Sequence, residues 1–116
     1  MASAIRELIR KKLASDVTIF GKSYCPYSIY VKDLFNKHNI RYTLLDVDEE
    51  DSRAEIEAQL RQMTGANVLP NVFIHSRFIE WTDLLREEGD LRGFLERVSS
   101  SAEKGEMVKE PMRATA

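Results

Sequence analysis

The sequence predicts an α/β domain with a mixed four-stranded β-sheet and helices on both faces. Short runs of β-forming apolar residues alternate with segments whose apolar residues recur at helical spacing, in the order α-β-α-β-α-β-β-α. This alternation is typical of α/β folds, and the two consecutive strands near the end add a hairpin. A chain of 116 residues with 43% apolar and 31% charged residues has the size and composition of one globular domain.

Residues 3–14 have the pattern of an amphipathic helix, so we expect residues 1–14 to form an N-terminal helix of the same domain. A basic, acid-poor N-terminus is also typical of a mitochondrial presequence, although Glu7 and the short length argue against that. We therefore expect a cytoplasmic protein, with a mitochondrial location as the alternative. The apolar residues fall on one stripe, made of Ile5, Leu8, Ile9 and Leu13.

The next part of the chain predicts a strand, a helix and a second strand. Residues 16–20 are a short apolar run, residues 26–38 have helical spacing, and residues 41–47 are rich in β-formers. Asn39 suits the left-handed conformation that ends many helices. A helix between two such strands joins them in parallel through a right-handed crossover.

A third helix is expected at residues 52–63, with Gly65 ending it. The acidic residues 46–51 lead into its N-terminus, where negative charge is favoured. Pro70 then opens the third strand, residues 72–74, because proline cannot donate a hydrogen bond inside a central ladder.

A hairpin and a final helix complete the predicted domain, which spans residues 15–98. Residues 75–77 form a tight turn without glycine, and the return strand starts at residue 78. The last helix is expected at residues 82–98, with a break at Gly89-Asp90. Residues 99–116 are polar and poor in β-branched residues, so we expect a disordered tail.

Composition and charge exclude several kinds of function. A net charge of −2 gives no basis for a nucleic-acid partner, and no apolar run approaches the ~18 residues of a membrane span. His38 and His75 lack metal-ligand spacing, and the acidic run 46–51 lacks the glycine and the last glutamate of a calcium loop. We therefore expect a monomer with no bound metal ion, no nucleic-acid partner and no membrane association.

The single cysteine of the chain, Cys25, lies where the first predicted strand gives way to a helix. The first turn of a helix has N–H groups without partners and carries the positive end of the helix dipole. Lys22 adds a cation, and Pro26 suits the first helical position. We expect the pKa of Cys25 to lie below its ordinary value of about 8.5, which makes Cys25 a nucleophile. The alternative is a buried structural cysteine.

Two motifs resemble those of the glutaredoxins, a family of the thioredoxin-fold superfamily. Residues 22–28, Lys-Ser-Tyr-Cys-Pro-Tyr-Ser, are similar to the family's active-site segment. Residues 63–65, Met-Thr-Gly, followed by residues 69–74, Leu-Pro-Asn-Val-Phe-Ile, are similar to the family's segment Thr-Gly-x-x-x-(Val)-Pro-x-Val-Phe-Ile. The resemblance covers residues 15–97 and implies the thioredoxin-like (glutaredoxin) fold, with a cis peptide bond at Leu69-Pro70.

The resemblance implies a thiol–disulfide oxidoreductase that uses glutathione as co-substrate and acts on glutathionylated proteins. Dithiol members have a second cysteine where this chain has Ser28. With one cysteine, a monothiol route remains. Cys25 attacks a mixed disulfide at the glutathione sulfur, and free glutathione then regenerates the thiolate. A native Ser28 and a serine that replaces a resolving cysteine give the same chemistry.

The resemblance also implies a glutathione site. Lys22 is similar to the family lysine that neutralises a glutathione carboxylate, and Tyr27 to the aromatic residue that lines the groove. Leu69 is similar to the residue whose backbone pairs with the cysteine of glutathione. Pro70, which follows it, is expected to shape the floor of the site and to lie against Cys25.

Two positions depart from the family pattern. Glu57 stands where many glutaredoxins have glutamine, and its charge would repel a carboxylate. Residues 80–83, Glu-Trp-Thr-Asp, replace a Gly-Gly-x-x-Asp turn. Thr82 and Asp83 are expected to hold the γ-glutamyl end of glutathione at a helix start, or alternatively to cap that helix without a ligand role. Trp81 would crowd the approach that glycine permits.

Two further functions stay open. Some glutaredoxins hold a [2Fe–2S] cluster across a dimer, with one cysteine from each chain and two glutathione thiolates. Pro26 argues against it, because the dedicated cluster carriers usually have Cys-Gly-Phe-Ser. The other alternative is a degenerate thioredoxin-fold module whose Glu80-Trp81 region contacts a protein. A brown colour after anaerobic purification would mark the cluster protein, and a retained fold without thiol reactivity would mark the module.

Overall fold

The structure is a computed structural model that describes residues 2–103. Its elements follow the predicted order, with two short 3₁₀ helices added. They are α1 (Ala2–Lys12), β1 (Val17–Gly21), α2 (Pro26–Lys37), β2 (Thr43–Asp46), η1 (Val47–Glu49), α3 (Arg53–Thr64), β3 (Asn71–Ile74), β4 (Arg77–Ile79), α4 (Trp81–Arg86), η2 (Glu88–Asp90) and α5 (Leu91–Glu103).

The strands form one mixed sheet in the order β2-β1-β3-β4. β1 pairs in parallel with β2, where Ile19 lies opposite Leu44, and antiparallel with β3, where Ile19 lies opposite Val72. β3 and β4 form the expected antiparallel hairpin, with Phe73 opposite Phe78. The predicted fold class, a mixed four-stranded sheet of the thioredoxin-like type, is confirmed.

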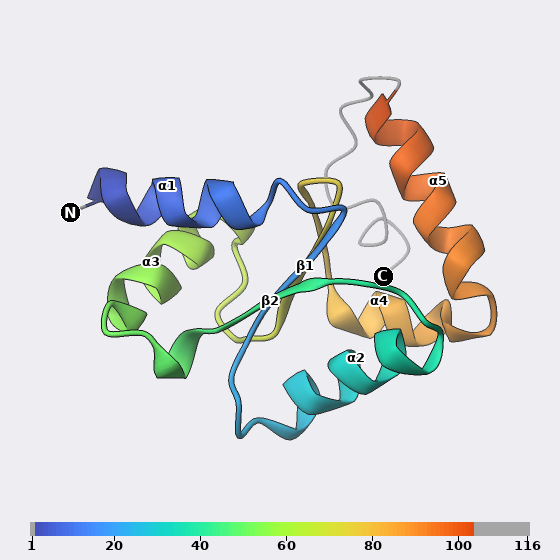
Figure 1. Cartoon of the computed structure of the whole chain (residues 1–116), viewed down its shortest axis with the longest axis horizontal. Helices are drawn as coiled ribbons and strands as arrows, with labels where there is room; N and C mark the ends of the chain where they lie inside the picture. Colours follow the sequence, from blue (N-terminus) through green and yellow to red (C-terminus); the bar gives the residue numbers. More distant parts are fainter. Residues whose placement is uncertain (1, 104–116) are drawn as a thin grey trace.

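Helices cover both faces of this sheet (Figure 1). α1 and α3 lie on one face, and α2, α4 and α5 lie on the other. Successive side chains of a strand point to opposite faces, so neighbouring residues of β1 enter different clusters. Ile19 packs with Val31 of α2 and Phe94 of α5, whereas Phe20 packs with Ile9 of α1 and Ile56 of α3. Two apolar cores therefore hold the central strand, from which the site described below extends.

The N-terminal helix is an integral part of this packing. Ile5 and Ile9 of α1 are buried against the α3 side of the sheet. The Thr18 hydroxyl of β1 donates a hydrogen bond to the carbonyl of Lys12 at 2.8 Å, which ties the end of α1 to the central strand.

Left-handed residues end α2 and α3 as predicted, and they also form the predicted tight turn of the hairpin. Asn39 (φ 58°) follows α2, and Gly65 (φ 76°) ends α3. The turn between β3 and β4 has positive φ at His75 (51°) and Ser76 (66°), without glycine. Hydrogen bonds to the segment before β1 hold this turn: the His75 N–H donates to the Asp16 carbonyl at 2.7 Å.

The end of the domain differs from the prediction. The expected break at Gly89 is present, because η2 separates α4 from α5. However, α5 continues to Glu103, so residues 99–103 of the predicted tail are helical. After Gly93, the sequence of α5 contains no glycine or proline. The rest of the predicted tail, residues 104–116, lies outside the described residues. Within residues 2–103, no helix is both long and apolar enough to cross a membrane.

We predict that Ile9→Ala lowers the free energy of unfolding by about 2–4 kcal/mol, because Ile9 is 1% exposed and its removal leaves a cavity between α1 and α3. Urea denaturation followed by circular dichroism measures the change. Arg6→Ala, on the exposed face of α1, is the control and should stay within about 0.5 kcal/mol of the wild type. An Ile9→Ala variant as stable as the control would mean that α1 is not part of the core.

Candidate functional site

The local backbone places Cys25 at the N-terminus of α2. Cys25 is the N-cap residue, with extended φ −82° and ψ 124°, and Pro26 occupies the first helical position. The Cys25 carbonyl accepts the first helical hydrogen bond, from Ile29 N–H at 3.0 Å. Its own N–H donates to the Lys22 carbonyl at 3.1 Å, which closes the turn between β1 and α2. The thiol, which is partly exposed, therefore occupies the position from which N-cap side chains meet free N–H groups.

The environment of the Cys25 sulfur favours the thiolate. Burial raises the pKa of Cys25, but the N–H groups of Ser28 and Tyr27, the Ser28 hydroxyl and the Lys22 charge together outweigh it. The pKa of Cys25 is therefore lowered from its ordinary value. The Cys25 side chain makes no N-capping hydrogen bond within the geometric limits of one. The nearby N–H and hydroxyl groups therefore act mainly as oriented dipoles, and Lys22 acts as a charge.

Ser28 stabilises this turn. Its side chain is fully buried, and its Oγ accepts a hydrogen bond from the Lys22 N–H at 3.1 Å. Gly21 lies so close that a Cβ there would come within 3.0 Å of the Ser28 Oγ. Because Oγ accepts from the backbone, its own proton is free to point at the sulfur. Ser28 thus links the end of β1 to Cys25.

A second tether holds the loop before Cys25. Ser23 donates two hydrogen bonds to the Asp48 carboxylate, from its hydroxyl at 2.6 Å and from its N–H at 2.8 Å. These bonds, with the hydroxyl contributing most, hold the pKa of Asp48 below its ordinary value. In the sequence, Asp48 is one of several acids expected to lead into a helix. Its observed role arises from a contact between η1 and the loop after β1, 25 residues apart along the chain, which no local pattern signals.

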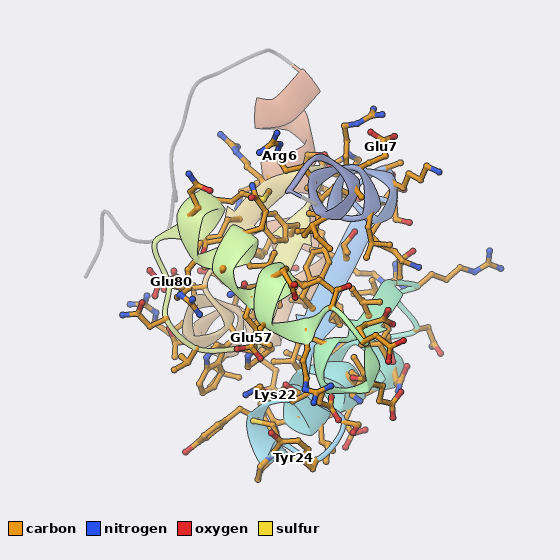
Figure 2. All side chains as sticks on the ribbon, turned by 90° about the vertical axis from the view of Figure 1, so that its left-hand side faces the viewer. Arg6, Glu7, Lys22, Tyr24, Glu57 and Glu80 are labelled. Atoms are coloured by element: carbon orange, nitrogen blue, oxygen red, sulfur yellow. The ribbon has the colours of Figure 1, made fainter. Side chains whose placement is uncertain are left out.

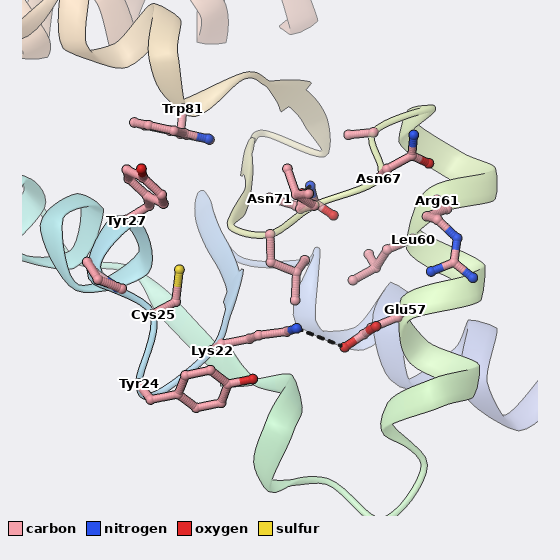
Figure 3. A pocket seen from close by; sticks show the side chains of 14 residues that line it. Lys22, Tyr24, Cys25, Tyr27, Glu57, Leu60, Arg61, Asn67, Asn71 and Trp81 are labelled. Carbon is pink, nitrogen blue, oxygen red and sulfur yellow. Dashed lines mark hydrogen bonds and ion pairs between the residues drawn. The ribbon is translucent and has the colours of Figure 1, made fainter.

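A groove of about 430 Å³ lies beside the thiol (Figure 3). Residues from α2, α3, β3, α4 and the loops before α2 and before β3 contribute to it, and the Cys25 sulfur faces its interior. Lys22, Tyr24 and Glu57 gather at the same end of the molecule, far from Arg6 and Glu7 of α1 (Figure 2). The lining of the groove consists of Lys22, Tyr24, Cys25, Pro26, Tyr27, Glu57, Leu60, Arg61, Ala66, Asn67, Val68, Leu69, Asn71 and Trp81.

One end of the groove is charged. The Lys22 ammonium lies 3.7 Å from the Glu57 carboxylate, and about two thirds of each side chain is shielded from solvent. Arg61, one helical turn after Glu57 on α3, lines the same end. Glu57 therefore does more than repel an incoming carboxylate. It forms an ion pair with Lys22, the cation predicted to bind that carboxylate.

The other end of the groove is aromatic. Tyr27 and Trp81 stack with ring centroids 5.0 Å apart and an interplanar angle of 30°. Trp81 also packs on the core cluster under α2 and α5, so it serves both as core packing and as groove wall.

The structure brings together four of the seven predicted site residues: Lys22, Cys25, Tyr27 and Leu69 line the groove. Pro70 forms the expected cis peptide bond with Leu69, but it is buried and is not one of the lining residues.

The other two predicted residues do not reach the groove. Thr82 is exposed and lies outside the lining, and the Asp83 side chain is buried in an ion pair with Arg86. Trp81 stands at the groove in their place, because it begins α4 and the following residues turn away with the helix.

The sequence analysis missed Arg61 and Asn71 of the lining. Asn71 is buried, and its side-chain amide donates to the Val68 carbonyl at 3.4 Å. The sequence feature that could have identified Asn71 as a lining residue is its position directly after Pro70. Across residues 2–103, no group of three or more histidine, cysteine, aspartate or glutamate side chains is placed to hold a metal ion.

Comparisons with known proteins agree with this architecture. The family model described as Glutaredoxin matches residues 17–79. A glutaredoxin of Solanum lycopersicum is 36% identical over 89 residues, which cover 74% of this chain and 82% of that protein. Glutaredoxin-C2 of Arabidopsis thaliana is 31% identical and covers 78% of this chain and 85% of its own. The crystal structure of a buckwheat glutaredoxin–glutathione complex superposes with a TM-score of 0.75 at 28% identity, covering 83% of this chain and 91% of that one.

We predict that iodoacetamide alkylates Cys25 with a pH midpoint below that of an ordinary cysteine, about 8.5. A lowered pKa leaves more thiolate at neutral pH, so alkylation at pH 7 is faster than for a free thiol. Ser28→Ala should raise the midpoint and slow the reaction at pH 7, since it removes the hydroxyl near the sulfur. Ser76→Ala, in the exposed β3–β4 turn, is the matched control. Identical midpoints for the two variants would contradict this account of the site.

Proposed function

The chain belongs to the glutaredoxin family, and we propose that it is a glutathione-dependent thiol–disulfide oxidoreductase that works through Cys25 alone. One observation carries the proposal. The single cysteine caps α2 beside an open groove, in surroundings that lower its pKa. We propose glutathionylated proteins as its substrates and a monomer as its working form.

The proposed reaction has two exchange steps. The Cys25 thiolate attacks the glutathione sulfur of a mixed disulfide, the old S–S bond breaks, and the substrate thiolate leaves and takes a proton from water. A second glutathione thiolate then attacks the sulfur of the adduct on Cys25. Oxidised glutathione leaves, and the Cys25 thiolate is restored. In this second step Cys25 is the leaving group, so the same lowered pKa assists both steps.

Ser28 supports the monothiol form of this reaction. A hydroxyl cannot form a disulfide, so a second thiol from solution must resolve every adduct on Cys25. Ser28 is also fully buried and engaged with the Lys22 N–H, so it contributes to the thiolate environment instead.

The groove supports glutathione as the co-substrate. The buckwheat structure is a complex with glutathione, and its fold matches this chain over most of its length. Leu69, in the loop before β3, lines the groove, and we propose that its backbone pairs with the cysteine of glutathione. The cations Lys22 and Arg61 at the charged end suit a ligand carboxylate.

We predict glutathione-dependent reduction of a small glutathionylated disulfide by the purified chain, and its complete loss in Cys25→Ser. Coupled oxidation of NADPH through glutathione reductase measures the turnover. Ser28→Ala is the companion variant and should keep measurable turnover, since it retains the nucleophile. Absence of turnover in the wild type, with Cys25 still readily alkylated, would contradict the proposed function.

We further predict that Glu57→Gln lowers the KM for glutathione by about two- to fivefold, with kcat little changed. Glu57 competes with the ligand carboxylate for Lys22 at 3.7 Å, and partly exposed ion pairs contribute about 0.2–1 kcal/mol. Steady-state kinetics at varied glutathione concentration measure both constants. Glu55→Gln removes one charge from the exposed face of the same helix and should leave KM unchanged. An equal KM in the wild type and Glu57→Gln would show that the ion pair does not oppose the ligand.

A further inference from the structure

The groove is chemically asymmetric about the reacting sulfur. Towards α3, its lining carries the charges of Lys22, Glu57 and Arg61. Towards α4, it consists of the stacked rings of Tyr27 and Trp81 (Figure 3). A ligand joined to Cys25 through a cysteine in its middle must extend one side to each end.

Among the described residues, no charged side chain of α4 lines the groove. Glu80, directly before Trp81, does not line the groove, and Asp83 is buried and paired with Arg86. Trp81 is anchored by packing on the core cluster, and its stacking on Tyr27 holds both rings in place. The aromatic end therefore offers no cation of α4 to a carboxylate and presents a preformed apolar surface.

We propose that Trp81 is a specificity-determining residue, which makes the α4 end of the groove select an apolar or aromatic group beside the reacting sulfur. This inference rests on the proposed function, since it takes Cys25 as the nucleophile. A carboxylate pressed against the ring faces loses water without gaining a partner, whereas an aromatic group gains stacking contacts.

The substrate class that fits is a cysteinyl peptide with a carboxylate on one side of the cysteine and an aromatic or apolar group on the other. Glutathione carries charged groups at both ends, so one of them meets the aromatic wall in either orientation. The reacting step is the same exchange as above. The Cys25 thiolate attacks the peptide sulfur, the bond to the leaving thiol breaks, and the leaving thiolate takes a proton from water.

Two matched disulfides test the proposal. One is the mixed disulfide of glutathione with 2-mercaptoethanol. The other replaces the γ-glutamyl group of glutathione by a 3-phenylpropanoyl group. Mass spectrometry in single-turnover mixtures measures how fast each peptide adduct forms on Cys25. We expect the phenyl analogue to react about three- to tenfold faster, which corresponds to the stacking contribution of an aromatic pair.

Variants assign the preference to Trp81. Trp81→Ala should remove the preference, Trp81→Phe should keep most of it, and Tyr30→Ala, on α2 outside the groove lining, should leave it unchanged. An unchanged circular dichroism spectrum and rate of Cys25 alkylation by iodoacetamide show that a variant is folded. Trp81 is the one tryptophan of the sequence, so its fluorescence in the wild type gives a second readout. It should change more on formation of the phenyl adduct than on formation of the glutathione adduct.

The outcomes separate this inference from the proposed function. Equal rates, a faster reaction with glutathione, or a preference that survives in Trp81→Ala would overturn the role of Trp81 and leave Cys25 as the nucleophile. No adduct with either disulfide, while iodoacetamide still alkylates Cys25, would overturn the proposed function and this inference with it.

Discussion

The contact between the Cys25 sulfur and the first turn of α2 is the interaction on which the site depends. Helix N-termini carry N–H groups without helical partners, and here two of them face a thiol. Their effect requires a fixed turn, and the structure fixes it three times over. The Cys25 N–H donates to the Lys22 carbonyl, and the Lys22 N–H donates to the Ser28 hydroxyl. The Ser23 hydroxyl donates to the Asp48 carboxylate. The two cores that hold β1 provide the rigid base from which this turn extends.

The groove combines a chemically general centre with ends particular to this chain. The centre contains the thiol at a helix start and the loop before β3, to which Cys25 and Leu69 belong. The ends are set by side chains from α3 and α4, where Glu57 neutralises Lys22 and Trp81 stacks on Tyr27. Reactivity and selectivity therefore reside in different elements, so that one can change while the other is retained.

Much of the fold was predictable from the sequence, because periodicity and turn residues act locally. Gly65, Asn39 and Gly89 marked breaks that the structure contains. The position of Cys25 before Pro26 also predicted its lowered pKa. The Lys22–Glu57 pair and the Ser23–Asp48 bonds were not predictable, because they join segments that only the tertiary fold brings together. Asp83 was misplaced for a different, local reason. It pairs with Arg86, three residues later in α4, and its buried carboxylate does not line the groove.

The most direct test of the central claim is to identify which half of a mixed disulfide becomes attached to Cys25. The purified chain is mixed with an equimolar glutathionylated peptide that has no apolar or aromatic residue beside its cysteine, in the absence of free glutathione, and intact-mass and peptide-level mass spectrometry follow the products. The account predicts glutathione on Cys25 and release of the peptide as a free thiol, because the nucleophile attacks the glutathione sulfur held in the groove. Attachment of the peptide to Cys25 with release of glutathione, or no adduct at all, would contradict it.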